Sequence, residues 1–422
     1  MKNVAAIILA AGKGERMKSE LPKVLHPVCS RPMLGFVLDL VKGLGMKQAV
    51  VVLGYKHDEV KKVLPEHIRS VVQKRIIGTA DAVKQALPYL RSFKGPVVIL
   101  YGDTPLLKTA TIEKLVKHHL ETKAAATLLT VQMEDPAGYG RIVRDRLGSI
   151  SSIVEEKDAD DFQKGIKEVN TGILCFDRQK LTECIKLVKA DNAKKEYYLT
   201  DVIAILRRKN EFVETVRSAD TLEVMGVNSR VELAQAHKAM QRRLQESYMK
   251  EGVTIVDPDS TFISFGAKIG VDTVIYPFTV IEKDVIIGKQ CSVGPFTRLR
   301  PGTRLDDQVV VGNFIEISRS KLSSRSRAKH FGFIGDTTVG QSANIGAGTV
   351  TANYDGKNKN RTVIKEGAFI GCDTVLVAPV CVGRFAKTGA GSVVTRGKNV
   401  PDRGVVAGVP ARVLQVKRKS HE

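Results

Sequence analysis

A short glycine-bearing loop close to the start of the chain carries the first residues that could do chemistry. It reads LAAGKGERM, from Leu9 to Met17, and brings Arg16 to the end of an apolar run. A backbone without bulky side chains can approach a ligand closely, and its N–H groups can point toward an anion. The loop therefore indicates a phosphate-binding site, although the loop alone does not say which phosphate.

The elements around this loop are typical of an α/β domain. The preceding run VAAIIL is short, apolar and rich in branched residues, which predicts a buried strand. Up to residue 227, strand-like and helix-like segments alternate, which predicts a mostly parallel sheet covered on both faces. A ligand site of such a sheet lies at the carboxyl ends of its strands, where the loop and the YGD of 101–103 both fall. We expect further strands at 49–55, 96–103 and 125–133, and helices at 31–45, 79–90 and 108–121.

The second half of the chain follows a different period. After a predicted linker helix at 229–252, aliphatic residues recur every six positions from 263 to 317. A six-residue repeat is the signature of a parallel β-helix, in which three hexads make one coil. The register returns at Phe333, Val339 and Ile345. We interpret the polar stretches at 318–330 and 351–362 as loops that leave the solenoid and carry function. The first ten aliphatic positions are Ile263, Ile269, Ile275, Ile281, Ile287, Val293, Leu299, Leu305, Val311 and Ile317.

Bulk properties exclude several classes of protein. No apolar run reaches ~18 residues, so we expect no membrane span. The six cysteines form no CxxC pair, which argues against a zinc site or a disulfide framework and favours the cytoplasm. The net charge of +21 suggests anionic partners. Because the charge is spread along the chain and no recognition motif interleaves basic with aromatic residues, we favour phosphorylated small molecules over nucleic acid.

Motifs in one order along nearly the whole chain carry a family likeness. The chain resembles the bacterial bifunctional N-acetylglucosamine-1-phosphate uridylyltransferase / glucosamine-1-phosphate N-acetyltransferases. That resemblance implies a Rossmann-like nucleotidyltransferase domain at 1–227, a linker helix at 228–252 and a left-handed β-helix at 253–422. The motifs are LAAGKGERM, LPKVLHPV, QKRIIGTADAV, YGDTPLL, GYGRIV, IVEEKDA, EVNTGI, EYYLTDVI and GVNSR in the first half, and GPFTRLRPG, VGNFIEI, NIGAGTVTANYDGKNK and VAPV in the second.

The resemblance implies that the first half transfers UMP from UTP to N-acetylglucosamine 1-phosphate and releases pyrophosphate. Such a reaction needs alignment and charge neutralisation, which Arg16 and Lys23 would supply. Asp103 and Asn228 match the family's Mg²⁺ ligands, and both offer hard oxygen donors. Glu15 and Asp81 depart from the family beside the motif positions. The other positions that match substrate contacts are Leu9, Ala10, Ala11, Gly12, Gln73, Gly78, Thr79, Tyr101, Gly102, Gly140, Glu155, Asn170 and Thr171.

In the second half, His330 matches the family's general base, and Glu316 matches the carboxylate that orients it. A neutral imidazole suits proton removal from the amino group of glucosamine 1-phosphate before that group attacks acetyl-CoA. Arg300 matches the arginine that binds the substrate phosphate, and Asn344 matches another acceptor contact. Positions 318, 333 and 372 depart from the family, with Ser318 where a phosphate-binding lysine is usual. Phe333 replaces a substrate-binding tyrosine. The positions assigned to coenzyme A, among which Cys372 is a departure, are Ala347, Asn353, Tyr354, Lys359, Cys372 and Ala390.

Several functions therefore remain open for the chain. The leading hypothesis is a cytoplasmic homotrimer that makes UDP-N-acetylglucosamine for the cell envelope, with Mg²⁺ as cofactor, acetyl-CoA as co-substrate and no nucleic-acid or membrane partner. One alternative is a sugar-1-phosphate nucleotidyltransferase whose β-helix is only a trimerising scaffold. In another, the β-helix acetylates a related amino sugar phosphate. A regulatory protein that keeps both folds as binding modules is the rival outside the enzymes. The set Arg16, Lys23, Asp103 and Asn228 argues against that last hypothesis, because a binding module has no need of it.

Overall fold

The computed structural model describes residues 1–414, so the last eight residues of the expected domain at 253–422 lie outside the described range. The chain divides into two compact units, Met1–Ala239 and Met240–Glu422. Each unit has a hydrophobic core of its own and is described by itself. Within residues 1–414, no helix has the length and apolar character needed to cross a membrane.

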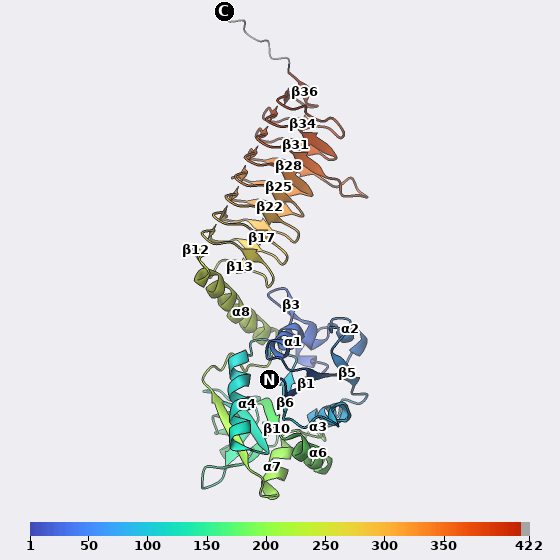
Figure 1. Ribbon diagram of the computed structural model, residues 1–422, viewed down its shortest axis with the longest axis vertical. Helices are drawn as coiled ribbons and strands as arrows, with labels where there is room; N and C mark the ends of the chain where they lie inside the picture. Colours follow the sequence, from blue (N-terminus) through green and yellow to red (C-terminus); the bar gives the residue numbers. More distant parts are fainter. Residues whose placement is uncertain (415–422) are drawn as a thin grey trace, which may run out of the picture. The chain divides into compact units, whose positions relative to one another are not determined.

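The first unit is built on the predicted mostly parallel sheet (Figure 1). β10 is antiparallel to its neighbours β6 and β7, and the other pairs along the main path are parallel. A hairpin of β8 (Arg141–Arg144) and β9 (Ile150–Val154) joins this sheet through β10. The strand order is β11 (Val213–Ser218), β7 (Ala126–Gln132), β10 (Glu168–Phe176), β6 (Val97–Tyr101), β1 (Ala5–Ala10), β4 (Gln48–Leu53) and β5 (Arg69–Val72).

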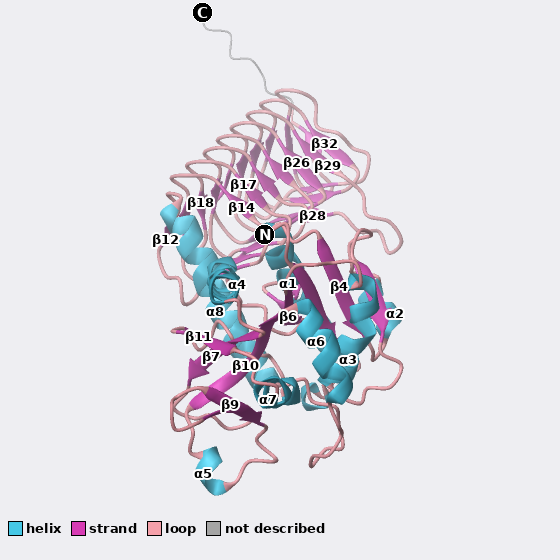
Figure 2. Ribbon diagram, turned by 60° about the horizontal axis from the view of Figure 1, so that its bottom comes forward, coloured by secondary structure: helices cyan, strands magenta, loops and turns pink. Residues whose placement is uncertain are grey.

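Helices cover both faces of this sheet, as the alternation of segments predicts (Figure 2). Successive residues of β1 point to opposite faces, so Ile7 packs in one core and Ile8 in the other. The first core contains residues of α3 (Thr79–Ala86), α6 (Arg178–Cys184) and α7 (Asp201–Arg208), and the second those of α1 (Met33–Gly43) and α4 (Thr109–Thr122). The smaller elements are α2 (His57–Lys61), α5 (Asp161–Lys164), β2 (Pro27–Val28), β3 (Arg31–Pro32) and 3₁₀ turns at Glu15–Met17, Lys23–Leu25, Leu87–Leu90 and Ile185–Leu187.

The second unit is a left-handed β-helix of three parallel sheets (Figure 1). The first sheet runs β12 (Thr254–Ile255), β15 (Val274–Ile275), β18 (Ser292–Val293), β21 (Val310–Val311), β24 (Arg327–Ala328), β27 (Asn344–Ile345), β30 (Phe369–Ile370), β33 (Lys387–Thr388), β35 (Val405–Ala407) and the antiparallel β36 (Arg412–Val413). The second runs β13 (Phe262–Ile263), β16 (Val280–Ile281), β19 (Arg298–Leu299), β22 (Ile315–Ser318), β25 (Gly332–Gly335), β28 (Thr349–Ala352), β31 (Val375–Val377) and β34 (Val393–Val394). The third runs β14 (Lys268–Ile269), β17 (Ile286–Ile287), β20 (Arg304–Leu305), β23 (Lys321–Leu322), β26 (Thr337–Val339), β29 (Thr362–Ile364) and β32 (Val380–Val382).

The hexad prediction holds up to Ile317, because all ten aliphatic positions are buried. The next stretch corrects two expectations. Residues 318–330 do not leave the solenoid; they form a further coil in which Leu322 and Ala328 point into the core. Phe333 is not an inward residue either, because Ile334 pairs with Ile317 and fills that position. The inward residues Ile317 and Leu322, and again Ile334 and Val339, are five positions apart instead of six, and these two short turns shift the register.

The segment expected to leave the solenoid at 351–362 does so in part. A bridge between Tyr354 and Lys359 closes a small loop between β28 and β29. Tyr354 is 61% exposed, and its hydroxyl donates to the carbonyl oxygen of Gly356 at 2.7 Å. This stretch is therefore the polar interruption that the fold accommodates outside its coils.

The helix α8 (Arg230–Lys250) supplies side chains to the first coil of the second unit. The amide of Gln241 both donates to the carbonyl oxygen of Ile263 at 2.7 Å and accepts from its N–H at 3.0 Å. Gln245 donates to the carbonyl oxygen of Thr261 at 2.6 Å, and Tyr248 to that of Ala267 at 2.5 Å. These contacts satisfy backbone groups at an edge that no preceding coil pairs.

Candidate active sites

The glycine-bearing loop turns directly beside Lys23. Gly14 has a φ of 69°, in the left-handed region, and a Cβ there would lie 2.6 Å from the Cβ of Lys23. Position 14 therefore requires glycine for both conformation and space. The loop follows β1, and the N–H of Gly102, which follows β6, donates to the carbonyl oxygen of Leu9 at 2.9 Å. Two neighbouring parallel strands thus deliver their loops to one edge of the sheet.

Lys23 joins the two residues that the resemblance assigns to a metal. Its ammonium forms an ion pair with Asp103 and donates to Oδ1 of Asn228 at 3.0 Å. The N–H of Val227 donates to the carbonyl oxygen of Asp103 at 2.9 Å, which ties the two segments together. A carboxylate and an amide oxygen therefore converge on one cation, and a divalent ion could take the same pair of donors. Within residues 1–414, no group of three or more His, Cys, Asp or Glu side chains could hold a metal ion.

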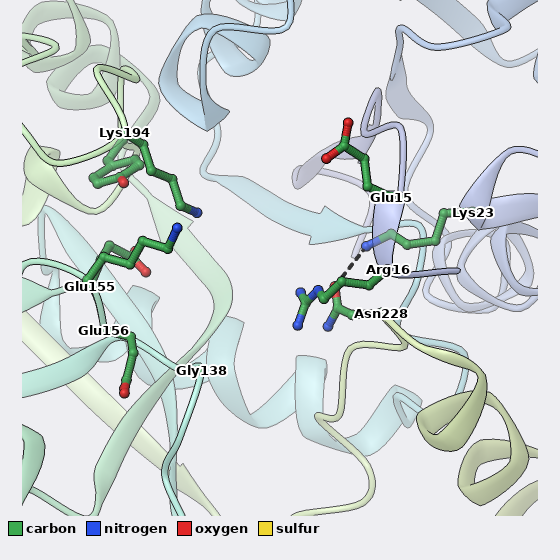
Figure 3. A pocket seen from close by; sticks show the side chains of 11 residues that line it. Glu15, Arg16, Lys23, Gly138, Glu155, Glu156, Lys194 and Asn228 are labelled. Carbon is green, nitrogen blue, oxygen red and sulfur yellow. Dashed lines mark hydrogen bonds between the residues drawn. The ribbon is translucent and has the colours of Figure 1, made fainter. Parts of the chain in front are cut away.

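Lys23 and Asn228 line a cleft of about 570 Å³ in the first unit. Figure 3 shows Arg16, Lys23 and Asn228 on one side of it, and Glu155, Glu156 and Lys194 across an open space on the other. The full set of lining residues is Gly14, Glu15, Arg16, Lys23, Gly138, Glu155, Glu156, Lys157, Lys194, Tyr198 and Asn228.

The wall across from Lys23 carries the residues expected to bind the sugar. Glu155 accepts a hydrogen bond from the hydroxyl of Thr200 at 3.1 Å. Burial raises the pKa of Glu155, and this bond and the charge of Lys194 oppose the rise. A Cβ at Gly140 would lie 3.5 Å from the Glu155 carboxylate, so Gly140 lies against it. Asn170 is buried on β10, next to Thr171.

The residues expected to bind uracil also come together. Gln73 donates to the carbonyl oxygen of Gly78 at 3.0 Å and to Asp81 at 2.8 Å. Thr79 begins α3, and its hydroxyl accepts from the N–H of Leu199 at 2.9 Å. Asp81, which departs from the family, therefore orients the amide of Gln73. The remaining predicted positions in the first unit lie at the ends of β1 and β6.

The second unit brings only some of its predicted residues together. Arg300 donates to the Glu316 carboxylate at 2.8 Å, and Phe333 is the register partner of Glu316 on the next strand. His330 is exposed at the corner before β25, and no hydrogen bond joins it to Glu316 in residues 1–414. Glu316 pairs with Arg300 in this arrangement, and the role of His330 as a base stays a prediction.

A second arginine lies where the family's phosphate-binding lysine is missing. Ser318 is buried, and its hydroxyl accepts from Arg319 at 2.9 Å. Asp336 binds the same guanidinium through two bonds of 2.7 and 2.8 Å and also accepts from the amide of Asn353. These bonds lower the pKa of Asp336 below its usual range, so the pair stays charged.

The other positions assigned to the acceptor and to coenzyme A lie in the following coils. Asn344 lies on β27, and Ala347 lies two residues after its end, where its carbonyl oxygen accepts from the N–H of Asp373 at 2.6 Å. Cys372 and Ala390 are exposed. With Tyr354 and Lys359, these residues come from neighbouring coils, but no bonds among their side chains organise them within the described residues.

Two lysines of the first unit were not singled out from the sequence. Lys157 and Lys194 both line the cleft. Lys157 stands inside the motif IVEEKDA, and Lys194 lies two residues before EYYLTDVI. Their closeness to motifs is the signal that could have found them.

Comparisons with known proteins agree with both halves of the chain. A family profile described as a MobA-like NTP transferase domain matches residues 6–168. A protein named bifunctional protein GlmU from Carboxydothermus hydrogenoformans is 46% identical, over 98% of this chain and 99% of its own length. Proteins of the same name from Shouchella clausii and from a Geobacillus strain are 44% and 43% identical. They match over 99% of this chain, and 98% and 97% of their own lengths.

Proposed function

The chain belongs to the family of bifunctional GlmU proteins, and on that premise we propose that it makes UDP-N-acetylglucosamine in two steps. The β-helix unit transfers an acetyl group from acetyl-CoA to the amine of glucosamine 1-phosphate. The nucleotidyltransferase unit then transfers UMP from UTP to the N-acetylglucosamine 1-phosphate formed, and releases pyrophosphate. The observation that carries the proposal is the convergence of Lys23, Asp103 and Asn228 beside the glycine-bearing loop.

In the uridylyl transfer, the sugar phosphate oxygen attacks the α-phosphate of UTP. The loop from Leu9 to Gly14 wraps the triphosphate with backbone N–H groups, and Arg16 neutralises its oxygens. Lys23 stabilises the charge that develops on the transferring phosphate. Glu155 and Asn170 orient the sugar through its hydroxyl and acetamido groups. The chain's contribution is therefore alignment and fixed charge rather than a covalent intermediate.

Mg²⁺ fits the donor set of this site. Asp103 and Asn228 would hold the ion, since their oxygens already converge on a cation, the ammonium of Lys23. When bound, the ion neutralises phosphate charge and aligns the leaving pyrophosphate. The remaining coordination positions suit phosphate oxygens and water.

For the acetyl transfer, we propose His330 as the base that removes the proton from the attacking amine. Arg300 binds the substrate phosphate, and Glu316, which pairs with Arg300, holds that guanidinium in place. Arg319 lies beside the position of the missing lysine and supplies a second cation there. Coenzyme A lies along Ala347, Tyr354, Lys359, Cys372 and Ala390. We further propose a cytoplasmic homotrimer, in keeping with the family resemblance.

The single change Asp103→Ala tests the first activity. We expect pyrophosphate release from UTP and N-acetylglucosamine 1-phosphate to fall roughly a hundredfold or more, because the metal loses its only charged ligand from the chain. Asp220→Asn is the matched control, since its carboxylate pairs with Lys108 at 2.7 Å outside the cleft. Retention of most activity by the Asp103 variant would contradict the proposed metal role.

The alternative for the β-helix is a scaffold without acetyl transfer. Assays of the unaltered chain distinguish the bifunctional proposal from this scaffold. Release of the coenzyme A thiol with glucosamine 1-phosphate supports the bifunctional proposal, and no thiol release together with normal pyrophosphate release supports the scaffold.

A further inference from the structure

Two lysine side chains on the sugar side of the cleft make no hydrogen bond or ion pair with the residues that the structure describes. Lys157 and Lys194 both line the cleft, and no ion pair or hydrogen bond involves either ammonium within residues 1–414. Two of the three acids that line the cleft are already paired. Glu156 forms an ion pair with the buried Arg141 at 2.7 Å, and Glu15 with Lys13 at 3.2 Å.

The backbone holds these two lysines next to each other. The carboxylate of Asp158 accepts from the N–H of Ala193 at 2.9 Å. Lys157 immediately precedes Asp158 and Lys194 immediately follows Ala193, so the two lysines flank this bond. Two ammonium groups that line one cleft repel each other, and an anion bound to both would reduce that repulsion.

The turn that carries Lys194 is fixed rather than loose. The side chain of Asn192 donates to the carbonyl oxygen of Glu196 at 2.6 Å and accepts from its N–H at 3.1 Å. The N–H of Tyr197 donates to the carbonyl oxygen of Ile77 at 2.8 Å, which anchors the end of the turn. Such support holds a cation ready for a ligand.

Lys194 points into the cleft. Figure 3 shows its side chain extending from the wall that carries Glu155 toward the space that faces Arg16. The Glu155 carboxylate accepts from Thr200 and is the one lining acid without an ion pair among the described residues. After the paired Glu156 is set aside, the side chains of this wall that line the cleft are the two lysines and the carboxylate of Glu155, which also has the carboxylates of Asp158 and Glu196 nearby.

We infer that Lys157 and Lys194 form a second anion-binding subsite, on the wall facing Arg16 and Lys23. The inference rests on the proposed nucleotidyltransferase function, because it assigns a substrate contact in the same cleft. The anion is either the phosphate of the incoming sugar 1-phosphate or an acidic group on the sugar ring. Either source would meet the same pair of ammonium groups.

Equilibrium binding to the full-length chain tests the inference without relying on turnover. The affinities of N-acetylglucosamine 1-phosphate and of glucuronic acid 1-phosphate are measured by calorimetry, in the absence of UTP. The variants are Lys157→Met and Lys194→Met, with Lys194→Arg to restore the charge. Lys195→Met is the matched control, because Lys195 stands on the same turn but does not line the cleft.

We expect each Met variant to bind a sugar phosphate about tenfold more weakly, the loss of one charge-assisted contact. The loss should shrink at high ionic strength, and Lys194→Arg and Lys195→Met should bind as the unaltered chain does. Equal weakening for both ligands identifies the phosphate as the bound anion, whereas weakening for the uronate alone identifies the ring carboxylate. Unchanged affinities for both ligands in both Met variants would overturn the inference. Pyrophosphate release by the unaltered chain, measured separately, decides the proposed function.

Discussion

At the scale of single residues, the first site is organised around one shared cation position. Asp103 follows β6 and Asn228 precedes α8, yet both side-chain oxygens meet the ammonium of Lys23. Lys23 can reach them because Gly14 leaves the space that a Cβ would fill. The lysine therefore occupies the pair of donors that a divalent ion would require, and the two cations should compete.

This competition predicts that Lys23→Met separates metal binding from catalysis. Without nucleotide, the variant should bind Mn²⁺ about tenfold more tightly, because no ammonium has to leave Asp103 and Asn228. Uridylyl transfer should nevertheless fall, since a cation that neutralises phosphate is lost. Paramagnetic resonance of free Mn²⁺ measures the affinity, and Lys13→Met serves as a control in the same loop. An unchanged or weaker Mn²⁺ affinity would show that the ammonium does not block the site.

At the scale of elements, the sequence predicts those strands, helices and coils that follow a repeating side-chain pattern. The alternation up to residue 227 predicts the parallel sheet, and the hexads predict the coils, because one side-chain period governs each element. It does not predict the antiparallel β10, whose pairing depends on distant strands. The sequence of 318–330 does not predict its coil, because Leu322 and Ala328 are the only apolar residues of this stretch that point inward. The position of Lys194 beside Lys157 is not predicted either, because it depends on a hydrogen bond between Asp158 and Ala193, which are far apart in the sequence.

The contact between α8 and the first coil of the β-helix gives a prediction about stability. Gln241 is buried and satisfies both backbone groups of Ile263, so Gln241→Leu keeps the helix propensity but leaves those groups without partners. We expect a loss of roughly 1–3 kcal/mol of unfolding free energy for each group, and faster hydrogen exchange at the Ile263 amide. Urea unfolding and exchange measure the two effects. Gln235→Leu, at an exposed position of α8, should change neither the unfolding free energy nor the exchange rate. Equal stability of the two variants would refute the capping role of Gln241.

At the scale of the whole molecule, the chain consists of two units with separate cores. All the residues that line the nucleotidyltransferase cleft lie in the first unit, and His330, Glu316 and Arg300 lie in the second. A local change in one unit therefore removes no packing contact from the core of the other. The product of the acetyl transfer is the substrate of the uridylyl transfer, so the intermediate has only to diffuse from one site to the other.

Two complementary variants test this independence. Given glucosamine 1-phosphate, acetyl-CoA and UTP, Asp103→Ala should accumulate N-acetylglucosamine 1-phosphate, and His330→Ala should leave the amine unmodified because it lacks the base. Neither variant alone should form UDP-N-acetylglucosamine, whereas a mixture should, since the released intermediate reaches the intact cleft of the His330 variant. Chromatography of the nucleotide sugars and a thiol assay follow both steps. The His330 variant should also use added N-acetylglucosamine 1-phosphate at the rate of the unaltered chain; a marked loss of that activity would show that the two units depend on each other.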